Sequence, residues 1–195
     1  MAYQAPRLLI VPGLRDSGPS HWQSWLQAQY RDARRVVQRD FSQPDLPRRV
    51  ERIHSHLDRA GPGPWVAVAH SFACLALVKH LAEQPDSPIQ QVLLVAPAEP
   101  DKFGLAELLP QQRLRVPSTV IASQNDPWMT AASAQRWAER WGSSFSNLGP
   151  VGHINNESGF GPFPLAKRWV EAAKARAARA QRPEHASLLE WSFAI

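Results

Sequence analysis

Short apolar runs alternate with segments of helical periodicity along most of the chain. Four runs have the length and composition of buried strands: residues 7–11, 65–69, 91–95 and 117–122. Two weaker strand patterns cover residues 34–38 and 144–148. The four strong runs are mostly apolar rather than apolar at alternate positions, which is typical of a parallel sheet covered on both faces. The pattern predicts a mainly parallel sheet of about six strands.

Amphipathic helical patterns fill the segments between the strands. They cover residues 21–30, 47–60, 72–83, 130–141 and 164–180. We expect Ser20 to cap the first helix, Pro47 to start the second, and one further short helix to form near Leu105. Because right-handed crossovers place helices on both faces of a parallel sheet, we expect residues 1–180 to form a single domain, a three-layer α/β/α sandwich. Residues 181–195 are left as a tail without assigned structure.

The composition is that of an ordinary globular protein, because 44% of the 195 residues are hydrophobic and 20% are charged. This balance excludes wholesale disorder. No stretch reaches the roughly 18 consecutive apolar residues of a membrane-spanning helix, and the apolar run after Arg7 is too short for a secretory signal. A single cysteine, Cys74, excludes an intrachain disulfide and a multi-cysteine metal site. We therefore expect a cytoplasmic protein with no membrane partner.

A net charge of +5 and an isoelectric point near 10 make nucleic acid a candidate partner. The arginines are scattered over both halves of the chain, and residues such as Arg49 and Arg52 are interleaved with acidic residues such as Glu51. Most of the arginines occupy positions at which a helix would face solvent. We therefore expect a solvated basic surface and no nucleic-acid partner.

The loop after residues 65–69 contains a candidate nucleophile. Ligands of parallel sheets bind beyond the carboxyl ends of the strands. At the carboxyl end of the predicted strand 65–69, residues 69–73 read A-H-S-F-A, which places Ser71 between a strand and a helix. A nucleophile elbow needs this arrangement, because the serine backbone is strained and large side chains two positions before or after it would clash. From these five residues alone, Ser71 is equally well explained as an ordinary helix cap.

Two further strand ends supply an acid and a histidine. Asp126 follows the fourth apolar run in the sequence S-Q-N-D-P, and His153 follows the last weak strand in the sequence G-P-V-G-H-I-N. Alone, the first would be interpreted as a turn residue and the second as a surface histidine. Together with Ser71 they stand in the order serine, acid, histidine at one edge of the sheet, which predicts a catalytic triad. Glu99 and Asp101 are the expected acids if Asp126 does not contact the histidine.

The first apolar run ends in a loop, V-P-G-L-R-D-S-G, that can complete an oxyanion hole. We expect the main-chain N–H groups of Leu14 and Phe72 to be the two donors. Phe72 begins the helix after Ser71, and the positive end of that helix would face a developing oxyanion. Gly13 would allow the main chain to come close to a substrate. A phosphate-binding loop is the rival interpretation, but neither G-x-x-x-x-G-K-[ST] nor G-x-G-x-x-G is present.

Four segments together resemble one known family, the small serine hydrolases typified by retinoblastoma-binding protein nine and the bacterial YdeN-type proteins. They are V-P-G-L-R-D-S-G-P-S-H-W-Q-S-W-L, A-H-S-F-A, S-Q-N-D-P and G-H-I-N, and the similarity spans about residues 7–170. The resemblance implies a compact α/β-hydrolase fold that lacks the two N-terminal strands of larger members. It also implies a triad of Ser71, Asp126 and His153, although Ala69 and Ala73 stand where the family commonly has glycine.

These observations predict a serine hydrolase that cleaves small carboxylic esters through an acyl-enzyme on Ser71, with thioesters and amides as further substrates. The alternative is a non-catalytic protein-interaction module that retains the fold. We expect no metal, no organic cofactor, a small acyl compound as the ligand, and a monomer. The residues expected to line an open pocket are Gly13, Trp22, His70, Trp128 and Phe160. Trp22 is equally well explained as a core residue.

Overall fold

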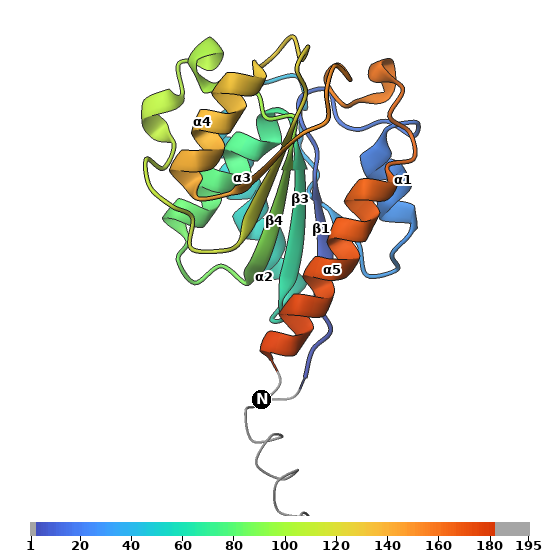
Figure 1. Ribbon diagram of the computed structural model, residues 1–195. Helices are drawn as coiled ribbons and strands as arrows, with labels where there is room; N and C mark the ends of the chain where they lie inside the picture. Colours follow the sequence, from blue (N-terminus) through green and yellow to red (C-terminus); the bar gives the residue numbers. More distant parts are fainter. Residues whose placement is uncertain (1–2, 182–195) are drawn as a thin grey trace, which may run out of the picture.

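The computed structural model describes residues 3–181, which contain a six-stranded sheet in the order β2-β1-β3-β4-β5-β6 (Figure 1). Every neighbouring pair of strands is parallel. The strands are β1 (Arg7–Val11), β2 (Arg34–Arg35), β3 (Trp65–His70), β4 (Ile89–Val95), β5 (Ser118–Ala122) and β6 (Ser144–Asn147). The predicted parallel sheet is confirmed, with the four strong apolar runs at its centre and the two weak strands at its edges.

Five α-helices cover the two faces of the sheet, which confirms the three-layer α/β/α sandwich (Figure 1). They are α1 (Trp22–Ala28), α2 (Leu46–Ala60), α3 (Phe72–Glu83), α4 (Ala131–Trp141) and α5 (Pro164–Ala180). The apolar sides of α2, α3 and α4 share one buried cluster with one face of the sheet, and those of α1 and α5 share a second cluster with the other face.

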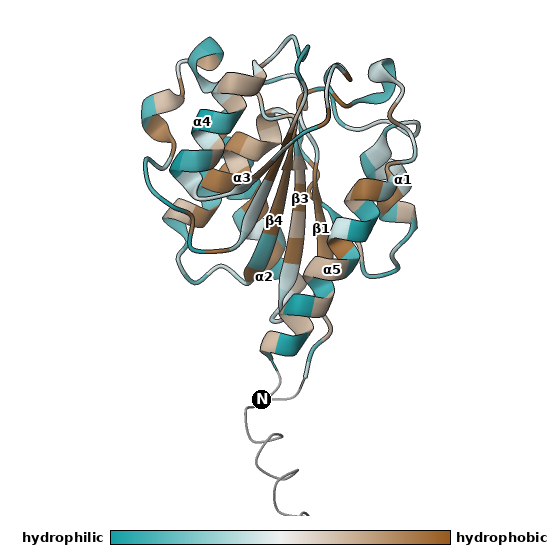
Figure 2. Cartoon of the chain, in the orientation of Figure 1, coloured by the Kyte–Doolittle hydropathy of each residue, from teal (hydrophilic) through white to brown (hydrophobic). Residues whose placement is uncertain are grey.

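The central strands are apolar on both sides because both sides are covered (Figure 2). In β3, Trp65, Ala67 and Ala69 belong to the cluster beneath α2, α3 and α4, whereas Val68 belongs to the cluster beneath α1 and α5. Successive side chains of a strand point to opposite faces. A strand buried on both faces therefore needs apolar residues at every position.

Three local predictions differ from the structure. Strand β2 ends at Arg35 rather than residue 38, because the chain turns away from the sheet there and leaves Val37 64% exposed. The cap of α1 is His21 rather than Ser20, since the His21 Nδ1 accepts a hydrogen bond from the Gln23 main-chain N–H at 3.1 Å. In place of one short helix near Leu105 there are two 3₁₀ turns, η1 (Pro100–Phe103) and η2 (Ala106–Leu108).

No helix within residues 3–181 combines the length and apolar character needed to cross a membrane. The C-terminal segment left unassigned from the sequence lies, from residue 182 onward, outside the described residues. The sheet nevertheless sets the geometry of the site. Because all six strands run in one direction, the loops after β1, β3, β4, β5 and β6 gather at one edge, the upper edge in Figure 1.

Candidate active site

Three side chains that are far apart in the sequence meet at this carboxyl edge. Ser71 follows β3, Asp126 follows β5, and His153 lies on the loop after β6. The His153 Nε2 is 2.9 Å from the Ser71 Oγ, and the His153 Nδ1 is 2.9 Å from each carboxylate oxygen of Asp126. The structure therefore brings together the serine, acid and histidine that the sequence singled out.

The hydrogen bonds within this group determine the tautomer of the imidazole. A carboxylate only accepts hydrogen bonds, so the His153 Nδ1 carries a hydrogen and donates a hydrogen bond to Asp126. The Nε2 is then the acceptor for the Ser71 hydroxyl. The Asp126 side chain is 3% exposed and that of His153 is 10% exposed. A hydrogen-bonded pair that is shielded from water in this way holds the imidazole in one orientation.

Ser71 sits on a strained turn between β3 and α3. Its φ of 56° lies in the left-handed region, which residues other than glycine seldom adopt. The Ser71 N–H donates to the Val95 carbonyl at 3.0 Å, and no side-chain cap bond to α3 is made. Ala69 and Ala73, the small residues on either side of the turn, are both buried. The explanation of Ser71 as an ordinary side-chain cap is therefore wrong.

The loop that carries His153 is tied to the loop that carries Asp126. The Asn125 Oδ1 accepts a hydrogen bond from the Gly152 N–H at 2.7 Å, and the Ser123 Oγ accepts one from the Val151 N–H at 3.1 Å. The His153 N–H itself donates to the Ser158 Oγ at 3.1 Å. These polar side chains position the two catalytic candidates relative to each other. These positioning residues were not predicted from the sequence, where their place in the same two loops is the only signal.

A second layer of buried histidines lies behind His153. The His70 Nε2 donates to the His153 main-chain carbonyl at 3.0 Å, and the His70 ring lies 4.8 Å from the rings of both His21 and His153. Burial, reinforced by the neighbouring histidines, holds the pKa of His70 well below its ordinary value. Burial, together with the charge of Arg35, lowers the pKa of His21 to about 4. Both rings are therefore neutral at pH 7. His70 was predicted to line the pocket, and it supports the main chain of His153.

The loop after β1 packs directly on the serine turn. A Cβ atom placed on Gly13 would lie 2.9 Å from the His70 carbonyl oxygen and 3.0 Å from the Ser71 Cβ, so only glycine allows this approach. Within residues 3–181 the N–H groups of Leu14 and Phe72 donate no hydrogen bond. Both predicted oxyanion donors are thus unpaired at the edge where Ser71 lies.

Arg49 binds the same loop through a set of main-chain carbonyls, a role that was not predicted from the sequence. Its guanidinium donates to the carbonyls of Pro12, Gly13 and Phe41 at 3.0–3.3 Å, and the residue is only 2% exposed. The expectation that Arg49 faces solvent is therefore wrong. Burial lowers the pKa of Arg49 to about 10, so the side chain is still charged at pH 7. A buried cation that reaches loop carbonyls cannot be distinguished in the sequence from one on an exposed helix face.

The remaining predicted pocket residues have different surroundings. Trp22 is fully buried and its Nε1 donates to the Ile154 carbonyl at 2.8 Å, so the prediction that it lines the pocket is wrong. Trp128 is 44% exposed with its ring 6.2 Å from that of His153. Phe160 is half-buried and packs edge-on against Phe163 at 5.1 Å. Of the predicted aromatic residues, Trp128 is therefore the one that stands open to solvent beside His153.

Other reactive groups lie apart from this constellation. Neither Glu99 nor Asp101 contacts His153 in the described chain, and one carboxylate oxygen of Glu99 is buried without a hydrogen-bond partner there. Burial raises the pKa of the Cys74 thiol well above its ordinary value, which makes it inert as a nucleophile. Residues 3–181 contain no cluster of three or more histidine, cysteine or acidic side chains that could hold a metal ion.

Comparison with known proteins agrees with this geometry. Residues 8–172 match a family model described as serine hydrolase. A YdeN-like hydrolase from Pectobacterium atrosepticum is 36% identical, with a TM-score of 0.82 over 91% of this chain and 92% of that one. The ydeN product of Bacillus subtilis is 20% identical, with a TM-score of 0.71 over 87% and 99%. A search of curated proteins found no match.

More distant structures share the fold. A protein of unknown function from Agrobacterium tumefaciens, described as an α/β hydrolase, is 14% identical, with a TM-score of 0.64 over 93% of this chain and 94% of that one. At this level of identity the likeness concerns the architecture alone. It agrees with the α/β-hydrolase fold seen in the sheet order and in the turn that carries Ser71.

Proposed function

The chain belongs to the serine hydrolase family, and we propose that it hydrolyses small carboxylic esters through an acyl-enzyme intermediate on Ser71. The observation that carries this proposal is the pair of contacts made by His153, with its Nε2 2.9 Å from the Ser71 Oγ and its Nδ1 2.9 Å from the Asp126 carboxylate. A hydroxyl beside an oriented base is the arrangement that nucleophilic acyl transfer requires.

In the first half of the reaction, the Ser71 Oγ attacks the carbonyl carbon of the ester while the His153 Nε2 takes the hydroxyl proton. The carbonyl oxygen becomes an oxyanion as the carbon becomes tetrahedral. The intermediate then collapses, the bond to the alcohol oxygen breaks, and His153 returns the proton to the leaving alcohol. Asp126 keeps the Nδ1 proton in place and stabilises the imidazolium between these two transfers.

The oxyanion is the charge that the site must stabilise most. The unpaired N–H groups of Leu14 and Phe72 are the proposed donors. Phe72 is the first residue of α3, so the positive end of the helix dipole adds to its N–H. Gly13 brings the loop against the serine turn, and Arg49 anchors that loop through its carbonyls.

In the second half, water attacks the acyl carbon of the intermediate. His153 now takes a proton from water and returns it to the Ser71 Oγ as the acid departs. Because the imidazole performs the same transfers in both halves, one set of residues serves the complete cycle. The proposed mechanism uses no metal and no organic cofactor.

The surroundings of the site favour a small or solvent-exposed acyl group. Residues 100–108, between β4 and β5, form only two 3₁₀ turns rather than a cap domain. Trp128, exposed beside His153, offers a flat apolar surface for one side of a substrate. Esters are favoured over amides because an alcohol leaves with less assistance than an amine does. The rival function is a protein-interaction module without catalysis, and it gives no reason for the aligned hydrogen bonds of His153.

Labelling by a fluorophosphonate probe tests the proposal, because such a probe phosphonylates only an activated serine. We expect the wild-type protein to be labelled and to hydrolyse p-nitrophenyl acetate. The Ser71→Ala variant should lose both properties while its circular dichroism spectrum stays unchanged. Ser42→Ala, which removes an exposed hydroxyl far from the triad in the sequence, is the matched control and should behave as wild type. A folded wild-type protein that is neither labelled nor active on the ester would overturn the proposal.

A further inference from the structure

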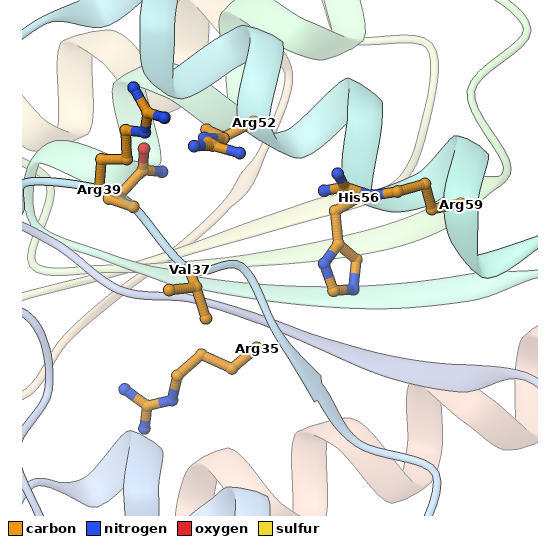
Figure 3. A pocket seen from close by; sticks show the side chains of 7 residues that line it. Arg35, Val37, Arg39, Arg52, His56 and Arg59 are labelled. Carbon is orange, nitrogen blue, oxygen red and sulfur yellow. The ribbon is translucent and has the colours of Figure 1, made fainter.

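A cavity lined by arginines lies between the segment that follows β2 and helix α2 (Figure 3). It has a volume of about 360 Å³. Its basic lining consists of Arg35, Arg39, Arg52 and Arg59, with His56 among them. In Figure 3, Arg52, His56 and Arg59 project from α2, whereas Arg35, Val37 and Arg39 come from the strand and the chain that follows it. Two segments separated in the sequence thus line one hollow, although the guanidinium of Arg35 points away from α2 (Figure 3).

The positive charge of this cavity is largely uncompensated. Its lining contains four arginines and no acidic residue. Arg35 is paired with Asp16 at 2.7 Å, but Arg39, Arg52 and Arg59 form no salt bridge within the described chain. Like charges that face one hollow repel one another, and an anion placed between them removes that cost. The arginines were expected to form a scattered, solvated surface, whereas Arg39, Arg52 and Arg59 lie around one cavity. The Arg35 guanidinium is held by Asp16, Gln27 and Ser24.

The state of His56 agrees with this accumulation of charge. The residue is half-buried, and its Nε2 has no hydrogen-bond partner among the described residues. Burial, followed by the charges of Arg59 and Arg34, lowers its pKa. The ring is therefore neutral at pH 7 and leaves the positive charge of the cavity to the guanidinium groups.

We propose that this cavity binds a small phosphorylated organic compound. A guanidinium presents parallel N–H donors that match two oxygens of a phosphate, and three unpaired guanidiniums are suited to a ligand with at least two negative charges. The volume is at the lower end of the range for small-molecule sites, roughly 300–1,000 Å³. Val37, 64% exposed at the cavity, offers methyl groups to the organic part of such a ligand.

A discrete hollow fits such a ligand better than a polymer. Polyanions such as nucleic acid bind to a stripe or groove of positive charge that follows their backbone. Here Arg39, Arg52 and Arg59, three arginines without a salt bridge in the described chain, line one discrete hollow rather than an extended stripe. None of the residues that line the cavity belongs to the proposed triad. This site is therefore one for binding, and it does not depend on catalysis at Ser71.

Calorimetric titration of the full chain with inorganic pyrophosphate tests the site. The Arg52→Gln/Arg59→Gln double variant removes two unpaired charges, and glutamine keeps a good helix propensity in α2. We expect wild type to bind pyrophosphate and the double variant to bind it at least about tenfold more weakly, since charge-assisted hydrogen bonds to phosphate are lost. Arg168→Gln/Arg179→Gln changes the net charge equally on α5, at the other face of the sheet, and should bind as wild type does.

Two further measurements separate this site from its rivals. Amide chemical-shift changes caused by pyrophosphate should map to residues 35–39 and to α2, and the Ser71→Ala variant should bind pyrophosphate as wild type does. The proposal is overturned if pyrophosphate at millimolar concentration neither binds nor shifts these amides. It is also overturned if both double variants weaken binding equally, or if the chain binds phosphatidylglycerol vesicles or single-stranded DNA but not pyrophosphate. Since Ser71→Ala is included, failure of this site and failure of the proposed hydrolysis give different results.

Discussion

The triad side chains at the carboxyl edge of the sheet are hydrogen-bonded to one another, and those of Asp126 and His153 are buried, whereas the arginines of the cavity are half-buried or exposed and mostly form no salt bridge. At the edge, the Asp126 side chain is 3% exposed. It is hydrogen-bonded to His153, which is also hydrogen-bonded to Ser71. At the cavity, Arg39 and Arg59 are exposed and form no salt bridge within residues 3–181. The two regions thus place polar groups in opposite environments.

The backbone shows the same contrast. The residues other than glycine that have positive φ in the described chain all lie near the carboxyl edge: Arg15, Asp16, Ser71, Ala96 and Ile154. The helical part of the cavity belongs instead to regular helix α2. Chemistry requires reacting atoms within a few tenths of an ångström, and a strained backbone is tolerated where it provides that position. Attracting an anion requires only that charges converge.

Replacing Asp126 with asparagine should produce the largest effect and should be confined to the carboxyl edge. An asparagine amide cannot hold the His153 imidazole in the tautomer that carries its proton on Nδ1. We therefore expect kcat for p-nitrophenyl acetate to fall by roughly 10⁴-fold. The thermal midpoint should change little, and pyrophosphate binding should not change. Glu99→Gln is the matched control because Glu99 does not contact His153, and near-normal turnover in Asp126→Asn would show that the wrong acid has been assigned.

Acidification should destabilise the protein through the buried histidine beside the catalytic loop. The pKa of His21 is lowered to about 4, so the folded state leaves it neutral between pH 6.5 and pH 4 while the unfolded state takes up a proton. The stability contributed by this group is therefore full above pH 6.5 and is lost as the pH falls toward 4. For His21 the loss approaches about a hundredfold in the folding equilibrium constant.

The variant His21→Asn tests this effect, because asparagine keeps the helix-capping acceptor of α1 but does not titrate. Urea midpoints measured from pH 7 to pH 4 should fall less in this variant than in wild type. His56→Gln is the counterpart at the cavity, where the histidine is only half-buried, and it should flatten the profile less. Equal pH profiles for wild type and His21→Asn would contradict the assignment.

A smaller effect is expected from Asn125, which positions the His153 loop without touching a substrate. Its Oδ1 accepts hydrogen bonds from the Gly152 N–H and from the Ser123 hydroxyl. In Asn125→Ala we expect kcat to fall roughly tenfold with KM nearly unchanged. A misplaced His153 reduces the stabilisation of the transition state but not the binding of the substrate. Gln124→Ala, at the exposed neighbouring position, is the control. A rise in KM at constant kcat would instead place Asn125 in substrate binding.

Much of the fold could be predicted from local patterns. Helices α3 and α5 have the predicted bounds, because continuous helical periodicity and clear start signals fall within each segment. The central strands follow from runs that are mostly apolar and do not alternate with polar residues. The length of β2 was overestimated, because the residues of this segment do not show where the chain leaves the sheet. Only the exposure of Val37 in the structure shows it.

The candidate site, like the fold, could be predicted from the sequence only in part. The positions of Ser71, Asp126 and His153 at strand ends could be identified because a parallel sheet brings such ends to one edge. The surroundings of Trp22 and Arg49 could not. An apolar residue near a loop can face either the pocket or the core, and an arginine on a helix can face either water or a set of loop carbonyls.

The order of apolar and polar residues by itself determined that the chain forms a parallel sheet with helices on both faces. It also determined that three reactive residues follow strand ends at one edge of that sheet. Burial and periodicity are local properties, and each element carries its own. The tertiary structure alone decided that His153 lies within hydrogen-bond distance of Ser71, that Arg49 supports the catalytic loop, and that three arginines without a salt bridge line one cavity. Those are distances between segments remote in sequence, which depend on how the helices pack on the sheet and not on any one segment.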